Sequence, residues 1–320
     1  MPAEVLAALR PHPGGRYIDA TAGGGGHTAL LLEHSAPGGQ VLAIDADPQA
    51  LERIAARLRE PLTSGQLLLA QGNFAELKHI AEHVGFGQVE GILFDLGLSS
   101  DQLADRARGF SFSGDGPLDM RFDPTQTTTA AELVNTLSEA ALADLIWRYG
   151  EERRSRLIAR RIVQARTRQP ITRTAQLAQI AASGVPGHPG GIHPATRTFQ
   201  ALRIAVNDEL KHLEEVLPQT LDLLAPGGRL AVISFHSLED RIIKRFFQIE
   251  ARDCICPPQT PLCICQHRAR IRVIAPHPIS ASPAEQEQNP RARSAKLRVA
   301  ERLIALSPDQ ERREGAHVEG

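Results

Sequence analysis

The fold is decided by residues 17–28, which read Tyr-Ile-Asp-Ala-Thr-Ala-Gly-Gly-Gly-Gly-His-Thr. A short apolar strand ends at the carboxylate of Asp19, four glycines follow, and His27 and Thr28 open a helix whose next residues are apolar. Strand, glycine turn and helix together predict a nucleotide-sized pocket at the carboxyl edge of a parallel sheet. Such a turn needs glycine because its backbone adopts positive φ and a ligand approaches it closely.

The glycine turn does not match the fingerprint of a dinucleotide site. That fingerprint is G-x-G-x-x-G, and counting from Gly23 or Gly24 places Thr28 or Ala29 where the last glycine belongs. A carboxylate before the glycines would also repel a pyrophosphate, whereas it suits a ligand with a cationic head such as S-adenosylmethionine. A glycine run alone is equally typical of an ordinary tight turn, so the remaining chain has to decide.

Two more predicted strands end in acids. Residues 41–44 are apolar and lead into Asp45, which lies roughly 20 residues beyond the glycines, the spacing of a ribose-binding acid in a doubly wound sheet. Residues 91–96 form a further strand that contains Asp95 beside a glycine. Three strands with acids at one edge of one sheet are hard to explain by packing. We therefore predict a parallel α/β sheet with a binding site at that edge.

A third strand, predicted at residues 66–70, is followed by Phe74. This aromatic side chain is placed to stack on an adenine, but a buried core position explains it equally well. Both interpretations stay open at this point.

Composition narrows the class of protein. The chain has 320 residues and a formal net charge of -1, so nucleic-acid binding would depend on local basic patches. It shows neither a run of about 20 apolar residues nor an apolar leader, which predicts a cytoplasmic protein without membrane contact.

The cysteines form one cluster. All four lie within twelve residues, at Cys254, Cys256, Cys263 and Cys265. Two close pairs of thiolates can enclose a tetrahedral zinc ion, although Cys-x-Cys is a less usual spacing than Cys-x-x-Cys. Structural zinc and free or redox-active thiols are both open.

The strand-helix alternation stops after residue 100 and resumes near residue 206. The intervening segment begins with a long loop and continues with helical patterns, and nine arginines against two glutamates lie between Arg148 and Arg173. We predict a core in two parts, residues 1–104 and 206–306, an inserted helical substrate-binding domain at 105–205, and a polar tail at 307–320. Residues 271–274 and 295–300 are expected to close the sheet as an antiparallel pair.

Eight blocks in this order resemble the ribosomal RNA small subunit methyltransferase H family of S-adenosylmethionine-dependent enzymes. They are Asp-Ala-Thr-Ala-Gly-Gly-Gly-Gly-His (19–27), Ala-Ile-Asp-Ala-Asp-Pro (43–48), Phe-Asp-Leu-Gly-Leu-Ser-Ser (94–100), Arg-Gly-Phe-Ser-Phe (108–112) with Asp-Gly-Pro-Leu-Asp-Met-Arg (115–121), Tyr-Gly-Glu-Glu-Arg (149–153), His-Pro-Ala-Thr-Arg-Thr-Phe-Gln-Ala-Leu-Arg (193–203), Ser-Phe-His-Ser-Leu-Glu-Asp-Arg (234–241) and Asn-Pro-Arg-Ala-Arg-Ser-Ala-Lys-Leu-Arg (289–298).

The resemblance implies a Rossmann-like class I methyltransferase sheet with an inserted all-helical domain. It also implies methylation of the N4 amine of a cytidine in the decoding region of small-subunit rRNA. Carried over by motif, the S-adenosylmethionine contacts are Gly25, Gly26, His27, Asp45, Phe74, Asp95 and Gln102. The implied partner is small-subunit rRNA within the small ribosomal subunit or a late precursor, and a homodimer is left open.

For catalysis we expect Asp95 to accept a hydrogen of the target amine. A carboxylate that accepts this hydrogen bond would shift the lone pair from the pyrimidine ring back onto the nitrogen. Alignment of the nitrogen with the methyl donor can lower the reaction barrier by ~7–11 kcal/mol. Phe110, Phe112 and Phe199 are candidates for stacking on the base. Arg197 and Arg203 are candidates for binding the phosphates next to the target base.

Two other classes of protein compete with this interpretation. The glycine turn with Asp45 also fits a nicotinamide-dependent oxidoreductase, although the missing third glycine and the arginine-rich insertion count against it. A non-catalytic RNA-binding or ribosome-assembly factor could retain the fold as a scaffold, but the acids at the three strand ends would then have no purpose.

Overall fold

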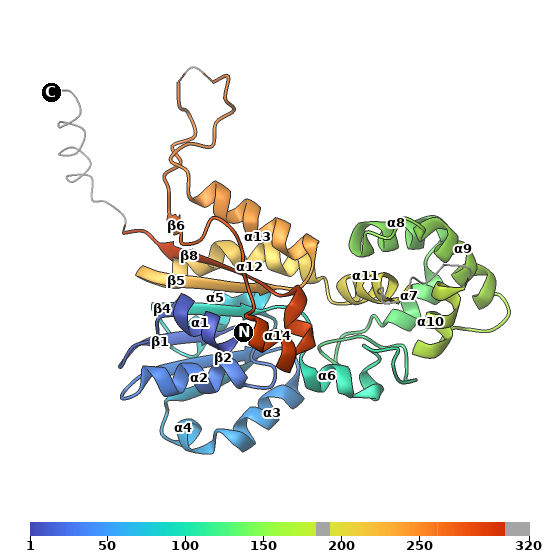
Figure 1. The fold of residues 1–320 in the computed structure, drawn as a ribbon, viewed down its shortest axis with the longest axis horizontal. Coiled ribbons are helices and arrows are strands. Elements are labelled where there is room, and N and C mark those ends of the chain that lie inside the picture. The colour runs from blue at the N-terminus through green and yellow to red at the C-terminus, as the bar shows by residue number, and fades with distance from the viewer. Residues whose placement is uncertain (184–192, 261, 305–320) are drawn as a thin grey trace. The chain divides into compact units, whose positions relative to one another are not determined.

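The computed structural model describes residues 1–183, 193–260 and 262–304, and the predicted polar tail at 307–320 lies outside these ranges. Its contacts divide the chain into two units (Figure 1). The first unit comprises Met1–Asp45, Gln49–Gly97 and the chain from Leu213 onward, and the second comprises Ala46–Pro48 and Leu98–His212. The assignment of residues 105–205 as a substrate-binding domain remains a proposal.

The first unit is built on one eight-stranded sheet. Its strands are β1 (Arg16–Asp19), β2 (Gln40–Asp45), β3 (Leu67–Gln71), β4 (Val89–Asp95), β5 (Leu224–Ser234), β6 (Ile271–Val273), β7 (Ile279–Ser280) and β8 (Lys296–Arg302). The order is β3-β2-β1-β4-β5-β8-β6, with β7 also paired to β8. Strands β1 to β5 are parallel, and β8 runs antiparallel to β5 and β6. The expected closing antiparallel pair is therefore confirmed.

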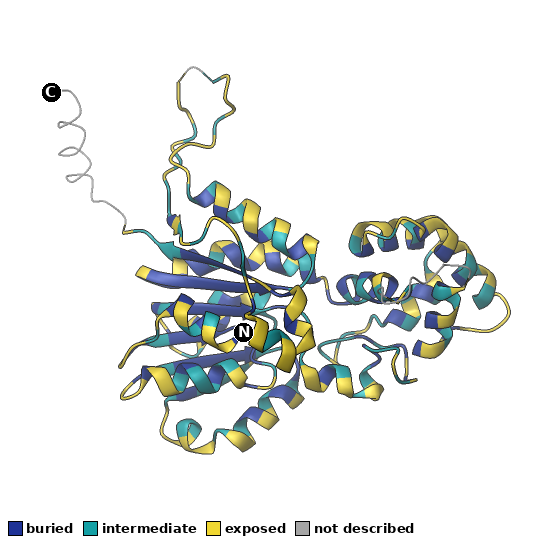
Figure 2. Ribbon diagram, viewed as in Figure 1, coloured by how far each residue is buried: buried dark blue, intermediate teal, exposed yellow. Residues whose placement is uncertain are grey.

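Helices cover both faces of this sheet. They are α1 (Pro2–Leu9), α2 (Gly26–Ser35), α3 (Pro48–Arg57), α4 (Arg59–Thr63), α5 (Leu77–His83), α12 (Glu209–Leu223), α13 (Ser237–Glu250) and α14 (Pro283–Gln288), with the short 3₁₀ turns η1 (Phe74–Glu76) and η3 (Pro290–Ser294). One apolar cluster joins the sheet to α1, α2 and α3, and the other joins it to α5, α12 and α13. The central strands β1, β2 and β4 and the second half of β5 are mostly buried between these layers, whereas the outer strands β3, β6 and β7 are only partly buried (Figure 2).

The second unit is helical. It contains α6 (Ser100–Ala104), η2 (Arg106–Arg108), α7 (Ala130–Thr136), α8 (Glu139–Gly150), α9 (Ser155–Arg166), α10 (Thr174–Ala182) and α11 (Thr196–Val206). Apolar residues from several of these helices form a separate core, among them Ile146 of α8, Ile158 of α9, Leu177 of α10 and Leu202 of α11. Together, the sheet and the helical insertion confirm the predicted Rossmann-like fold with an inserted helical region.

One helix in the second unit is shorter than the sequence predicts. A continuous helix is expected from His193 to Leu210, but α11 ends at Val206 and Asp208 takes φ +48°. The Asn207 side chain explains the break, because it donates to the Met120 carbonyl at 2.8 Å and accepts from the Phe122 amide at 2.7 Å.

The sequence predicts a helix that starts at Ser138-Glu139 and is closed by Gly150, and α8 confirms both ends, with Glu151 in the left-handed conformation at φ +50° just beyond it. A Cβ atom at Gly150 would lie 2.5 Å from the Arg197 carbonyl oxygen, so glycine permits the close approach of α11 to α8.

No helix among the described ranges is long and apolar enough to span a membrane.

Candidate functional site

The three predicted acids emerge on one face of the sheet at its carboxyl edge. Asp19 ends β1 and pairs in register with Ala43 of β2 on one side and Leu93 of β4 on the other. Asp45 and Asp95 lie two residues beyond those partners. Since side chains repeat every second residue along a strand, all three carboxylates share a face. This is the face that packs on α1, α2 and α3.

Strand β1 is the shortest of the three at this edge. Its neighbours each run two residues further, which corresponds to about 7 Å of strand on either side of Asp19. The glycine turn occupies the end of β1, and its backbone is tied to both neighbours. Ala20 donates to the Leu93 carbonyl and Ala22 to the Ile44 carbonyl, each at 2.9 Å.

Asp19 is the most deeply buried acid of the site. Its Oδ2 atom accepts the Thr28 hydroxyl at 2.7 Å, while Oδ1 is buried without a hydrogen-bond partner among the described residues. Burial raises the pKa of Asp19, and the neighbouring His27 and the Thr28 hydroxyl only partly oppose this. A buried carboxylate oxygen without a donor is suited to a cationic or hydrogen-bonding ligand.

Asp45 fixes the beginning of the glycine turn. Its Oδ2 atom accepts the Gly23 amide at 2.7 Å. Gly23 and Gly25 both have positive φ, at +50° and +70°, and the Arg57 guanidinium donates to the Gly25 carbonyl. The turn is therefore held from both strands and from α3.

The cofactor glycines predicted from the motif serve different purposes. A Cβ atom at Gly25 would lie 2.8 Å from Ile54 Cγ1, so this glycine relieves a clash in addition to adopting positive φ. At Gly26 an added Cβ would meet nothing within 4 Å. Gly26 is the exposed first residue of α2, and its lack of a side chain leaves open backbone at a helix N-terminus.

Asp95 and His27 form a pair within the site. The His27 Nε2 atom lies 3.6 Å from Asp95 Oδ2, and the Asp95 amide donates to the Thr21 hydroxyl at 2.6 Å. Asp95 Oδ1 and His27 Nδ1 are both buried and have no hydrogen-bond partner among the described residues. The pair thus retains an acceptor and a ring nitrogen with unused hydrogen-bonding capacity.

Phe74 is both a packing residue and partly accessible. It begins η1, where the Asn73 side chain accepts the Ala75 amide at 2.9 Å, and its ring meets Phe94 edge-on at a centroid distance of 5.7 Å. The ring packs against the buried core but is itself of intermediate exposure. Both interpretations from the sequence are compatible with this position.

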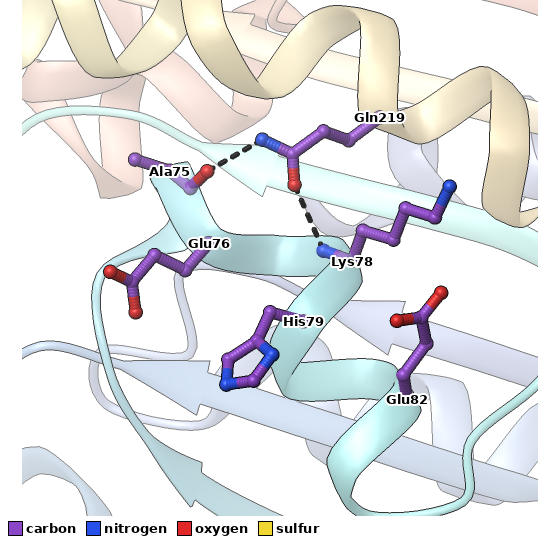
Figure 3. Close-up of a pocket in the computed structure, with 6 residues that line it drawn as sticks. All are labelled: Ala75, Glu76, Lys78, His79, Glu82 and Gln219. Atoms are coloured by element: carbon purple, nitrogen blue, oxygen red, sulfur yellow. Dashed lines mark hydrogen bonds between the residues drawn. The ribbon is translucent and has the colours of Figure 1, made fainter.

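Gln219 of α12 anchors the 3₁₀ turn that carries Phe74. Its amide nitrogen donates to the Ala75 carbonyl at 2.6 Å, and its amide oxygen accepts the Lys78 backbone amide at 3.0 Å (Figure 3). A surface pocket of about 400 Å³ lies here, lined by Ala75, Glu76, Lys78, His79, Glu82 and Gln219. None of these residues is among the predicted cofactor contacts. The pocket lies where Gln219 holds η1 in place.

Gln102, the remaining predicted contact, belongs to the second unit. Its side chain closes a capping box, accepting the Ser99 amide at 3.1 Å, and donates to Asp47 at 3.3 Å. Arg108 donates to the same Asp47 oxygen at 2.7 Å. Gln102 is buried in this network, so its orientation is set by the first turn of α6 and by Asp47.

Sequence reasoning missed the residues that orient the acids. Thr21 and Thr28 flank the glycine run and bind the backbone of Asp95 and the side chain of Asp19, and Arg57 reaches the turn from α3. A threonine beside a buried acid is a recognisable indication of such a role. The contact of Arg57 has no local sequence signature.

The second unit corrects two expectations about RNA-binding residues. Phe110 and Phe199 are buried in its apolar core, so neither presents a ring for a base to stack on. Phe112 is partly exposed and meets Phe199 edge-on at 5.0 Å. Arg203 forms a bidentate ion pair with Glu209 at 2.7 and 2.9 Å, so this guanidinium is already committed within the protein.

Three arginines of the arginine-rich segment, which we expect to share one face, lie at exposed positions in or next to α9. Arg153, Arg156 and Arg160 are all exposed, and Arg160 lies 3.6 Å from Glu139. Arg197 of α11 is also exposed and donates to the Glu151 carbonyl at 3.2 Å. The apolar side of α9, including Ile158 and its neighbours, packs in the core of the unit.

The four cysteines converge in the first unit. All are free thiols, and their sulfur atoms lie within 4.8 Å of one another, between α13 and β6. This grouping fits the predicted cluster and takes no part in the carboxylate site.

Comparison with known proteins places this arrangement in a family. A family model described as the MraW methylase family matches residues 1–303. Ribosomal RNA small subunit methyltransferase H of Thermomicrobium roseum is 59% identical over 298 residues, which cover 93% of this chain and 91% of that protein. The protein of the same name from Heliobacterium mobile is 49% identical over 303 residues, covering 94% and 96%.

Among solved structures, an rRNA methylase from Streptococcus thermophilus aligns with a TM-score of 0.42 and 14% identity, covering 95% of this chain and 98% of that one. The family model and the two relatives confirm the resemblance that the eight sequence blocks indicate. This chain belongs to the MraW methylase family.

Proposed function

We propose that this chain is an S-adenosylmethionine-dependent methyltransferase that modifies small-subunit ribosomal RNA. The observation that carries the proposal is the placement of Asp19, Asp45 and Asp95 on one face at the carboxyl edge of a parallel sheet. The names of the two relatives supply the reaction and the class of RNA. Ligands of open α/β sheets bind at this edge.

The residues present fit S-adenosylmethionine better than a dinucleotide. Asp19 and Asp95 each have a buried oxygen without a hydrogen-bond partner in the described ranges, and three carboxyl side chains share this face of the sheet. That environment favours a ligand with an ammonium and a sulfonium and disfavours a pyrophosphate. The open backbone at Gly26 further supports close approach of a ligand. When bound, S-adenosylmethionine supplies an electrophilic methyl group.

Side chains of the site and the backbone of the glycine turn would together hold the donor. The buried Asp19 suits the ammonium group, Asp45 the ribose hydroxyls, and the partly exposed ring of Phe74 the adenine. Gly25, Gly26 and His27 would contact the methionine portion through the turn and the first residues of α2. The resemblance adds Gln102, whose amide is oriented by Ser99 and Asp47.

Asp95 is the proposed catalytic residue. The lone pair of an amine attached to a pyrimidine is delocalised into the ring, so the amine is a poor nucleophile. The Asp95 carboxylate would accept a hydrogen bond from one N–H group of the amine. This bond localises the lone pair on nitrogen and holds the amine in line with the methyl donor. The Nε2 atom of His27 lies 3.6 Å from Asp95 Oδ2 and restricts the orientation of the carboxylate. The Thr21 hydroxyl fixes the backbone of Asp95 at the end of β4.

The finer substrate assignment rests on the family resemblance. We propose the N4 amine of a cytidine in the decoding region, presented within the small ribosomal subunit or a late precursor. The exposed arginines around α9 are suited to contacting phosphates, because charge-based contacts dominate affinity for nucleic acids. Zinc at the four cysteines is a separate proposal, because those residues take no part in methyl transfer.

A methyl-transfer assay tests the proposal. The purified chain is incubated with S-adenosylmethionine labelled in its methyl group, together with unmodified small subunits or naked rRNA in parallel reactions. The expected result is label in rRNA on a single cytidine, mapped by mass spectrometry of nuclease fragments. Failure to methylate either substrate would favour the scaffold interpretation.

Thermal stabilisation separates the remaining rival. S-adenosylmethionine should raise the melting temperature of the chain, whereas NAD should leave it unchanged. Stabilisation by NAD alone would indicate an oxidoreductase instead. An Asp19→Ala variant, which lacks the buried carboxylate, is the matched control and should lose the response to S-adenosylmethionine.

A further inference from the structure

The cysteine excursion, residues 251–270 between α13 and β6, carries a second site. We propose that Cys254, Cys256, Cys263 and Cys265 bind one structural zinc ion. Their sulfur atoms all lie within 4.8 Å of one another, with 3.6 Å between Cys263 and Cys265 and 3.8 Å between Cys265 and Cys254. Four thiolates around a tetrahedral zinc at ~2.3 Å are separated by about 3.8 Å. The observed spacing is therefore that of a mononuclear tetrahedral site.

Backbone amides are already directed at the sulfur atoms. The Ile255 amide donates to Cys265 Sγ and the Cys256 amide to Cys254 Sγ, each at 3.4 Å. Amide donors of this kind orient metal-binding thiolates and offset part of their negative charge. The first of these bonds joins the two arms of the excursion, so the pairs approach each other in a defined arrangement.

No described residue of the tip of the excursion, residues 254–260 and 262–266, is buried. Ile255, Leu262 and Ile264 are 46%, 79% and 79% exposed, and Figure 2 shows this part of the chain as largely exposed. A segment that buries so little apolar surface cannot offset its loss of conformational entropy by packing. A bound metal supplies the missing stabilisation, as it does in other small elements that lack a core.

The neck of the excursion, residues 250–253 and 267–270, is closed without the cysteines. The Arg270 amide donates to the Glu250 carbonyl at 2.7 Å and the Ala269 amide to Asp253 at 3.2 Å. A His267 ring nitrogen also lies 2.8 Å from the Arg252 carbonyl oxygen. Loss of the metal is therefore expected to release the tip while the neck and the sheet stay folded.

The site lies at the opposite edge of the sheet from the carboxylates. Helix α13 begins just after the carboxyl end of β5 and runs for 14 residues, about 21 Å, before the excursion starts. Figure 1 shows the excursion leaving the far end of α13, next to β6. This position indicates a structural ion, since no cysteine is near the residues proposed to bind the methyl donor.

Ligand chemistry favours zinc over the other metals. Four thiolates select zinc or iron, whereas carboxylate-preferring ions such as magnesium and calcium are excluded. An iron-sulfur cluster would hold the cysteines further apart, because its iron and sulfide atoms must fit between them. Zinc is also without redox chemistry, in keeping with a structural role.

Metal analysis of the full chain tests the proposal directly. The chain is purified under reducing conditions without chelator and measured by inductively coupled plasma mass spectrometry, with about one zinc ion per chain expected. A Cys254→Ser, Cys263→Ser double variant should lose the zinc. Ile264→Ser is the matched control, since it introduces the same side chain into the same tip without removing a thiol, and it should retain the zinc.

Limited proteolysis reports on the structural role. Leu262 is exposed in the tip, so chymotrypsin should cleave after it faster in the double variant than in the parent or in Ile264→Ser, while the neck stays intact. Binding of S-adenosylmethionine should be unchanged in all three proteins, which separates failure of this proposal from failure of the proposed function. A preparation that holds iron, or one with four alkylatable thiols and no zinc after zinc is supplied, would overturn the assignment.

Discussion

The carboxyl edge of the sheet and the helical second unit differ in how well their functional residues follow from sequence. At the sheet edge Asp19, Asp45 and Asp95 share one face, as their positions at strand ends require. In the second unit Phe110 and Phe199 are buried in the core, and Arg203 is paired with Glu209. Residue types that suggest RNA contact thus serve packing and ion pairing there.

The difference has a physical origin. In a parallel sheet, hydrogen-bond register and a two-residue repeat decide which side chains lie together, and both can be read from strand positions. On a helix, an aromatic or arginine side chain points into the core or outward according to which other helices pack against it. Four experiments can sharpen or break this contrast.

The largest effect is expected at Phe199 in the core of the second unit. Phe199→Ala should lower the free energy of unfolding by about 3–5 kcal/mol, because a buried ring is replaced by a cavity. Urea denaturation monitored by circular dichroism measures this. Phe112→Ala is the control and should cost less, because that ring is only partly buried. Equal stability of Phe199→Ala and the parent would restore the base-stacking role.

The next effect concerns turnover at the sheet edge. Asp95→Ala should reduce kcat by about 10²–10³-fold, since the acceptor for the amine hydrogen is removed. Asp95→Asn keeps a carbonyl oxygen at this place and should fall between the variant and the parent. The readout is single-turnover methylation of small subunits with bound donor, and calorimetry checks that the donor still binds. Full activity of Asp95→Ala would refute the assignment.

Asp19 should show opposite effects on stability and binding. Asp19→Asn can still accept the Thr28 hydroxyl but cannot ionise, so affinity for S-adenosylmethionine should fall about tenfold or more. Because burial raises the pKa of Asp19, its ionisation disfavours the folded state once the pH exceeds 3.8, the ordinary value for this carboxyl. The variant should therefore unfold at a higher temperature than the parent at neutral pH.

This stability gain should shrink as the pH is lowered toward 3.8, where the carboxyl is increasingly protonated in the unfolded chain as well as in the folded one. Thermal unfolding of both proteins over a series of pH values measures the trend. A variant less stable than the parent at neutral pH would show that the charge of Asp19 is compensated within the protein.

The smallest effect is expected on the exposed face around α9. Arg156→Ala should raise KM for the RNA substrate by a few fold and leave the stability of the protein unchanged. The slope of log affinity against log salt concentration should fall by about one. Arg148→Ala is a matched control, because it removes the same charge from an exposed position on α8, where the guanidinium is already paired with Asp144 at 3.3 Å. Equal behaviour of both variants would argue against a specific phosphate-binding face.

The part of the site that could be predicted consists of residues tied to strand ends and turns. The glycine run, Asp45 and Asp95 were identifiable because strand, turn and helix succeed one another over a short stretch of chain. The supporting contacts were not, since Arg57 reaches Gly25 across 32 residues and Gln219 reaches the turn of Phe74 across 144. Such contacts depend on how helices are laid against the sheet.

Sequence alone determined the parallel sheet, its acidic carboxyl edge and the clustering of four cysteines, because these follow from local periodicity and from spacing along the chain. Only the tertiary structure decided that Asp19 is buried beside Thr28, that Gly150 makes room for α11, and that Phe199 belongs to a core. Burial and close approach arise between segments distant in sequence, and no local pattern encodes them.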